Sequence, residues 1–327
     1  MEVIQHRGAS IVSSADGTET ADAVRAQLHR MWSSVAPGWD EHAAFVDARA
    51  GAITERLPEL ARLEPGDRVL ELACGAGGLG LAAAARVGAR GEVVLSDVAP
   101  EMTAIARRRA DSLGVDVRTC VLDLEAIDEP EASYDAVLCR EGLMLVPDPA
   151  RAVREIARVL RPGGRVALAV WGPRERNPWL GVVFDAAGAE LGAPVPPPGL
   201  PGPFSLDDAD RFSHLLAGAG LVDVRVAEEP APYRATSAVE WWSRTVALSG
   251  PLGQRLAALP GRWRAPSSSV RGRRSPSTRL PRDSTSPASR SSRRRCGRSR
   301  PRGTRGSPFE PWVGPVYTGP TRRVGLV

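Results

Sequence analysis

The chain has 327 residues, 43% of them hydrophobic, so it can form one large or two ordinary domains with a substantial core. It has no run of about 18 uncharged apolar residues and no basic-then-apolar signal at the N-terminus, so we expect a cytoplasmic protein without a membrane span. The net charge is +5, every basic residue is arginine, and the four cysteines form no Cys-x-x-Cys pair. This cysteine spacing argues against a zinc site or a disulfide framework, and we predict no metal site.

The first 60 residues divide into a flexible part and a helical part. We expect residues 1–20 to be flexible. Residues 21–60 are predicted to be helical, with a break at Pro37-Gly38. Trp32 and Trp39 lie in this part, where each could serve as an apolar anchor in a core.

The segment from Arg68 to Gly80 predicts a buried strand, a tight turn and the start of a helix. Its glycines 75, 77 and 80 satisfy G-x-G-x-x-G, and Asp97 follows at about the spacing of the dinucleotide fingerprint. Glu71 lies four residues before the first glycine. As an ionised carboxylate it would repel a pyrophosphate and attract a cationic amine. The loop therefore predicts a polar ligand, and Glu71 makes an NAD-type dinucleotide the weaker alternative.

Strands and helices alternate after this loop, which is typical of an open α/β sheet with parallel strands. Strands are predicted at 92–96, 115–122, 134–139, 165–171 and 221–227, and helices at 100–113, 149–160, 181–191 and 206–219. Ligands of such sheets bind at the carboxyl ends of the strands, where Asp97 and Asp123 lie. Asp97 is placed to accept two hydrogen bonds from ribose hydroxyls. The alternative for Asp123 is a solvated loop residue.

These motifs together resemble the class I S-adenosylmethionine (SAM) dependent methyltransferases. The resemblance covers about 100 residues, from Glu-x-x-Cys-Gly-x-Gly at Glu71 to the Arg-Val-Leu-Arg-Pro-Gly-Gly turn that ends at Gly164, its most specific signature. The segment from Met31 to Asp40 resembles the aromatic-x3-Ala-x2-aromatic-Asp signature of the ubiquinone/menaquinone C-methyltransferase branch (methyltransferase type 11).

The resemblance implies a Rossmann-like sheet with helices on both faces and SAM as the cofactor. In this family Asp97 would bind the ribose, Asp123 and Leu124 would meet the adenine, and Trp39 would belong to a lid. Met102 would line the apolar side of the adenine. The full set of cofactor-binding residues expected is Glu71, Ala73, Gly75, Ala76, Gly77, Asp97, Val98, Met102, Asp123, Leu124, Arg140 and Trp39.

The methyltransferase domain would span residues 21–261, with a cap at about 172–250 that supplies the acceptor pocket. After the fourth strand the chain reads Cys139-Arg-Glu-Gly, where nucleic-acid amine methyltransferases carry Asn/Asp-Pro-Pro-aromatic. This difference favours a small-molecule acceptor, quinone-like or another secondary metabolite, methylated at carbon or oxygen. No catalytic base is assigned, because a surface or packing role explains the candidates more simply. They are His42, Glu141 and His214.

Residues 262–327 differ in composition from the rest, with 17 arginines against 2 acidic residues, compared with 26 against 36 in residues 1–261. Residues 264–307 carry almost no large apolar side chains, so we expect a disordered tail. It could be a shifted reading frame, an inert extension or an arm for acidic partners. Since residues 264–307 contain no aromatic residue, we expect only weak, salt-sensitive nucleic-acid binding and no specific nucleic-acid partner.

A class I sheet normally ends with a seventh, antiparallel strand between the fifth and sixth. The sequence offers no good candidate after Pro260, because residues 313–327 carry three glycines and two prolines. The seventh strand is therefore expected to be missing or poor. Two alternatives to an active enzyme follow: a SAM-binding but inactive protein with a damaged C-terminus, or a nucleic-acid methyltransferase that uses the basic tail.

Overall fold

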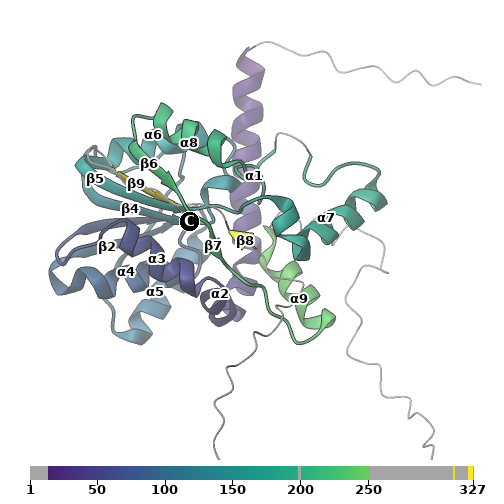
Figure 1. Cartoon of the computed structure of the whole chain (residues 1–327), viewed down its shortest axis with the longest axis horizontal. Coiled ribbons are helices and arrows are strands. Elements are labelled where there is room, and N and C mark those ends of the chain that lie inside the picture. Colours follow the sequence, from purple (N-terminus) through teal and green to yellow (C-terminus); the bar gives the residue numbers. More distant parts are fainter. Residues whose placement is uncertain (1–13, 198–199, 251–311, 314–322, 327) are drawn as a thin grey trace, which may run out of the picture.

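The computed structural model describes residues 14–197, 200–250, 312–313 and 323–326, which form a seven-stranded sheet between two layers of helices (Figure 1). The strand order is β3-β2-β1-β4-β5-β9-β6, and every pair of neighbours is parallel. The strands are β1 (Arg68–Leu72), β2 (Glu92–Asp97), β3 (Arg118–Val121), β4 (Tyr134–Arg140), β5 (Leu160–Ala169), β6 (Val222–Val226) and β9 (Arg323–Leu326). A separate antiparallel pair joins β7 (Glu229–Pro230) to β8 (Trp312–Val313).

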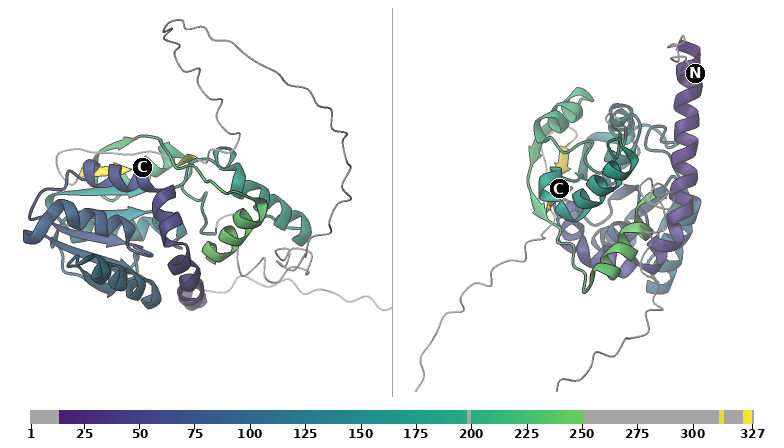
Figure 2. Two further views of the ribbon diagram at one scale, coloured as in Figure 1. Left: turned by 90° about the horizontal axis from the view of Figure 1, so that it is seen from below. Right: turned by 90° about the vertical axis from the view of Figure 1, so that its right-hand side faces the viewer.

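Helices cover both faces of the sheet, as predicted. One face carries α3 (Gly51–Leu60), α4 (Gly78–Val87) and α5 (Pro100–Leu113), and the other carries α6 (Pro149–Val159) and α8 (Ala209–Gly218) (Figures 1 and 2). The remaining helices gather at one end of the sheet: α1 (Ser14–Glu41), α2 (Ala43–Arg49), α7 (Pro178–Leu191) and α9 (Ala238–Leu248). The first turns of α1 project beyond the body of the molecule (Figure 2).

The local sequence explains the starts of α5 and α6, but the break predicted at Pro37-Gly38 is wrong, because α1 runs through Pro37 to Glu41. Pro100 opens α5, where its missing N–H costs nothing, and the Asp148 side chain accepts from the Arg151 amide at 2.9 Å to cap α6. The turn predicted at 161–164 lies inside β5, which begins at Leu160, and Gly163 there has a φ of +78°. A register shift opposite β4 accommodates these extra residues within the strand.

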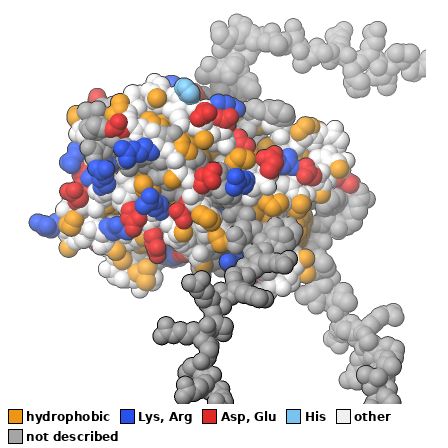
Figure 3. All heavy atoms as spheres, viewed as in Figure 1, with side chains coloured by type: hydrophobic (Ala, Val, Ile, Leu, Met, Phe, Trp, Pro, Cys, Tyr) orange, Lys and Arg blue, Asp and Glu red, His pale blue; other side chains and the backbone are white. Residues whose placement is uncertain are grey.

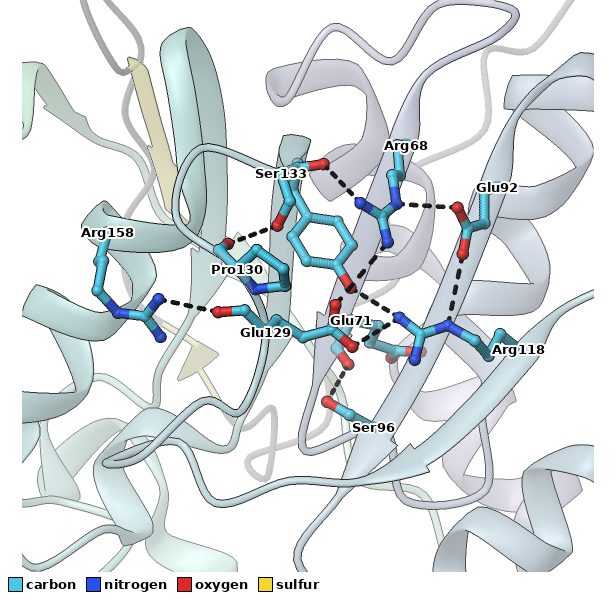
Figure 4. Close-up of polar contacts among 10 residues, drawn as sticks. Arg68, Glu71, Glu92, Ser96, Arg118, Glu129, Pro130, Ser133 and Arg158 are labelled. Carbon is cyan, nitrogen blue, oxygen red and sulfur yellow. Dashed lines mark hydrogen bonds and ion pairs between the residues drawn. The ribbon is translucent and has the colours of Figure 1, made fainter.

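An ion-pair network ties together the amino ends of the strands, opposite the end where ligands of such sheets bind (Figure 4). Glu92 forms ion pairs with Arg68 at 2.8 Å and with Arg118 at 3.4 Å, so the first residues of β1, β2 and β3 are joined. Glu129, 9% exposed, pairs with Arg118 at 2.6 Å in front of β4. Because the Arg68, Glu92 and Arg118 side chains are more than a third exposed, each of their pairs contributes little to stability.

The position between β5 and β6 is filled, contrary to the expectation that its strand is missing. Residues Arg323–Leu326 form β9 there and pair with both neighbours. The strand runs parallel to both, so it is not the antiparallel strand that the family normally has. The backbone groups of β5 and β6 thus find partners in a segment whose side-chain pattern is unusual for a central strand.

Residues 1–13, 251–311 and 314–322 lie outside the described residues. They include most of the arginine-rich segment at 262–327, so the predicted flexibility of the N-terminus and disorder of the tail stay predictions. On the face shown in Figure 3, basic and acidic side chains are interspersed. In the part of the chain that the structure describes, no helix is both long and apolar enough to cross a bilayer.

Candidate cofactor site

The loop between β1 and α4 has the backbone geometry expected of a ligand-binding glycine turn. Gly75 and Gly77 have φ values of +51° and +83°, which side-chain-bearing residues rarely adopt, and Gly77 is the N-cap of α4. A Cβ on Gly75 would lie 3.2 Å from the Trp39 ring. The predicted lid residue Trp39 therefore lies directly on the glycine loop, and its Nε1 donates to the Leu248 carbonyl of α9 at 3.2 Å.

Asp97 holds this loop from the end of β2. Its Oδ2 accepts from the Gly75 amide at 2.9 Å and its Oδ1 from the Ala99 amide at 3.0 Å. Burial raises the pKa of this carboxyl, and the backbone hydrogen bonds oppose that effect. Asp97 thus lies beside the loop, as predicted, with both oxygens engaged by backbone amides.

Glu71 lies on the other side of the loop, at the end of β1, and is almost completely buried. Its Oε2 accepts from the Gly80 amide at 2.8 Å, so it caps the first turn of α4. A Cβ on Gly80 would overlap the Leu95 side chain and this carboxylate, which explains the third glycine of the motif. Burial raises the Glu71 pKa from 4.5 to about 8, although Arg140 opposes the rise. Burial thus favours the protonated form of a carboxyl that the sequence interpretation takes as already ionised.

Asp123 follows β3, and basic side chains of α1 lie over it. Arg25 and His29 each approach its Oδ2 at 3.4 Å, while its Oδ1 accepts from the Glu125 amide at 2.8 Å. Leu124 beside it is buried. The position is thus not the solvated loop of the simpler interpretation, although its contact with adenine stays a prediction.

The remaining predicted residues surround the loop from several elements. Ala76 and Met102 share a small core with Ala36, Ala43, Ala99 and Ile105, against which Trp32 and Trp39 pack. Val98 is half-buried, and Ala73 has a φ of +52°. Arg140 reaches α3, where it donates to the Thr54 Oγ1 at 2.5 Å.

The sequence analysis missed several residues that bind these elements together. Arg109 of α5 donates to the Ala76 carbonyl and pairs with Asp47 of α2. Arg49 of α2 pairs with Glu141 at the end of β4 at 2.5 Å. These partners lie 33 to 92 positions apart, and no local motif marks them. The other base candidates are less enclosed: His42 is half-buried and His214 is exposed.

The comparisons with known proteins agree with this geometry. A family model described as a methyltransferase domain matches residues 69–164. Demethylmenaquinone methyltransferase from Thermus thermophilus is 35% identical over 155 residues, which cover 47% of this chain and 70% of that protein. This chain belongs to the class I SAM-dependent methyltransferases. The similarity extends to the ubiquinone/menaquinone C-methyltransferase branch.

Two further methyltransferases show how much of such proteins the similarity covers. A ubiquinone/menaquinone biosynthesis C-methyltransferase from Ralstonia nicotianae is 37% identical over 134 residues, 37% of this chain and 55% of that protein. A ubiquinone biosynthesis O-methyltransferase from Xanthomonas axonopodis pv. citri is 44% identical over 111 residues, 33% of this chain and 45% of that protein. The chain thus spans a little over half the length of the first of these relatives. Family membership assigns the cofactor as SAM and excludes the dinucleotide alternative.

Proposed function

We propose that this protein transfers the methyl group of SAM to a small-molecule acceptor. The observation that carries the proposal is the pair of buried carboxyls on adjacent strands, Glu71 and Asp97, each bonded to an amide of the glycine loop between them. A cofactor with a cationic amine and a ribose diol matches this pair, whereas a pyrophosphate would meet two acids. SAM supplies a methyl group on a strongly alkylating sulfonium, so positioning does most of the work.

The residues of the chain would divide this task. Asp97 binds the ribose: its carboxylate oxygens, which accept from backbone amides here, would accept from the ribose hydroxyls instead. Glu71 binds the cationic amine of the cofactor. Ala73, Ala76 and Gly77 present loop backbone to the amino-acid end of the cofactor. The adenine lies near Val98, Met102, Asp123 and Leu124, with Trp39 of α1 covering the loop and Arg140 balancing the charge of Glu71.

For the acceptor we propose a quinone-like aromatic compound. The named relatives act in ubiquinone or menaquinone biosynthesis, some at carbon and some at oxygen, so both attacking atoms stay open for this chain. An aromatic group lies beside the carboxyl end of β5, where Trp171 contacts Trp179 of the proposed cap at residues 172–250, with ring centroids 5.3 Å apart. This environment fits a flat ring better than a nucleic-acid backbone.

Two measurements test the proposal in sequence. Calorimetry with SAM and, separately, NADH should show binding of SAM alone. Transfer of a labelled methyl group to a panel of reduced quinones and catechols should then identify the acceptor. SAM binding without methyl transfer to any acceptor would favour the alternative of an inactive SAM-binding protein. Methyl transfer to nucleic acid alone would favour the alternative of a nucleic-acid methyltransferase. Binding of NADH but not SAM would contradict the proposal outright.

A further inference from the structure

The end of β4 carries a strained and buried acid that the cofactor does not require. Glu141 has a φ of +61°, in the region that favours glycine, and its side chain is 11% exposed. Its Oε2 pairs at 2.5 Å with Arg49, whose side chain is 8% exposed. Strained backbone of this kind persists only where the surroundings enforce it, and it is concentrated at functional sites.

The second oxygen of Glu141 is buried without a partner. Its Oε1 lacks a hydrogen bond, as do the buried Nε1 atoms of Trp171 and Trp179. Trp171 lies close enough to help lower the Glu141 pKa. However, the contact between the Trp171 N–H and the Glu141 Oε1 does not satisfy the geometry of a hydrogen bond. Burial alone would raise that pKa, yet Arg49 and then Arg140 outweigh it, and the carboxylate stays ionised. Since buried polar atoms are normally satisfied, an ionised oxygen with no donor needs an explanation.

The surroundings of this carboxylate are aromatic. Arg49 lies over the Trp171 ring at 5.8 Å, Trp171 contacts Trp179, and Trp179 stacks on Tyr233 with ring centroids 4.2 Å apart. Phe204 packs against Trp171, with ring centroids 6.1 Å apart. Aromatic faces with a few polar atoms are the usual lining of a site for a flat organic molecule.

The carboxylate also lies next to the cofactor loop. A Cβ on Gly142 would overlap the Ala73 side chain, so the segment after β4 presses against the start of the glycine loop. Arg140 lowers the pKa of both Glu71 and Glu141, so it lies near both acids. Glu141 thus lies between the cofactor loop and the aromatic group, where an acceptor must approach a methyl donor.

We infer that Glu141 Oε1 accepts a hydrogen bond from a hydroxyl group of the methyl acceptor, whose aromatic ring packs against the aromatic group of Trp171, Trp179 and Tyr233. The inference rests on the proposed function and names the substrate class of that site. A neutral hydroxyl fits better than an amine cation, because Arg49 and Arg140 already surround the carboxylate with positive charge. Glu141 would be a specificity-determining residue that orients the ring, with no covalent step of its own.

The test compares two ligands that differ only in the hydroxyl groups. Binding of 1,4-naphthalenediol and of 1,4-dimethoxynaphthalene is measured by calorimetry under nitrogen, with and without S-adenosylhomocysteine. Wild-type protein should bind the diol about 10- to 100-fold more tightly, as one hydrogen bond to a charged acceptor predicts. In Glu141→Gln this preference should fall to within about threefold, because the acceptor loses its charge. Equal wild-type affinities for the two ligands would overturn the inference, and this arm needs no variant.

Glu129→Gln is the matched control. Glu129 is similarly buried, at 9% exposed, and similarly paired with arginine, but at the opposite end of the sheet. It should keep the wild-type preference for the diol. An unchanged preference in Glu141→Gln, or an equal loss in both variants, would contradict the inference. Failure of S-adenosylhomocysteine to bind any of the proteins would instead refute the proposed function, since the diol comparison is also run without it.

Discussion

Glu71→Gln should weaken SAM binding and abolish a proton release. An ammonium about 4 Å from an ionised carboxylate gains about 4 kcal/mol at an effective dielectric constant of 20. Because burial raises the Glu71 pKa to about 8, deprotonating Glu71 at pH 7 costs about 1.4 kcal/mol, which reduces the binding free energy gained from the ion pair. The charge should thus contribute about 2–3 kcal/mol, and we expect SAM affinity to fall roughly 30- to 150-fold in the variant. The amide oxygen of glutamine can still accept from the Gly80 amide, so α4 should keep its cap.

Calorimetry in buffers of different ionisation enthalpy measures the protons released on binding. Wild-type protein at pH 7 should release close to one proton more than Glu71→Gln, since the cofactor amine contributes equally in both.

The stability of the protein without cofactor provides a second measurement. The folded protein keeps a proton on Glu71 that the unfolded chain loses above pH 4.5, so this stabilisation is complete below pH 4.5 and is lost as the pH rises to about 8. Wild-type stability should fall relative to the variant by up to about 1.4 kcal/mol per pH unit in that window. Equal proton release and parallel stability profiles would refute the reasoning.

Three further changes test the remaining elements. Asp97→Ala should weaken SAM binding at least tenfold, because each hydrogen bond to a charged acceptor contributes about 1.5–3 kcal/mol, and an unchanged affinity in the folded variant would remove Asp97 from the site. Gly80→Ala should lower the free energy of unfolding by about 1–3 kcal/mol in denaturant titrations, since the added methyl overlaps Leu95, whereas Gly218→Ala, with nothing near its Cβ, should not. Deletion of residues 323–327 should lower the denaturation midpoint by unpairing β5 and β6, and an unchanged midpoint would show that β9 adds no stability.

Much of the candidate site follows from local sequence. The strand, glycine turn and helix around Gly75 depend on backbone preferences within a few residues, and the predicted loop and α4 are confirmed. The positions of Asp97 and Asp123 follow from parallel strands that all end at one edge of the sheet. Their exact partners did not follow, because Arg25 and His29 reach Asp123 from a helix about 100 residues earlier in the chain.

By itself, therefore, the sequence determined the order of strands and helices and the carboxyls that flank the loop. These features depend on hydrophobic periodicity and on residues close together in the chain. Only the tertiary structure raises the Glu71 pKa, because that shift depends on complete burial among distant residues. Only the tertiary structure joined Arg49 to Glu141 beside the aromatic group, and only it placed β9 between β5 and β6. Such contacts depend on the packing of the whole chain, which no local pattern encodes.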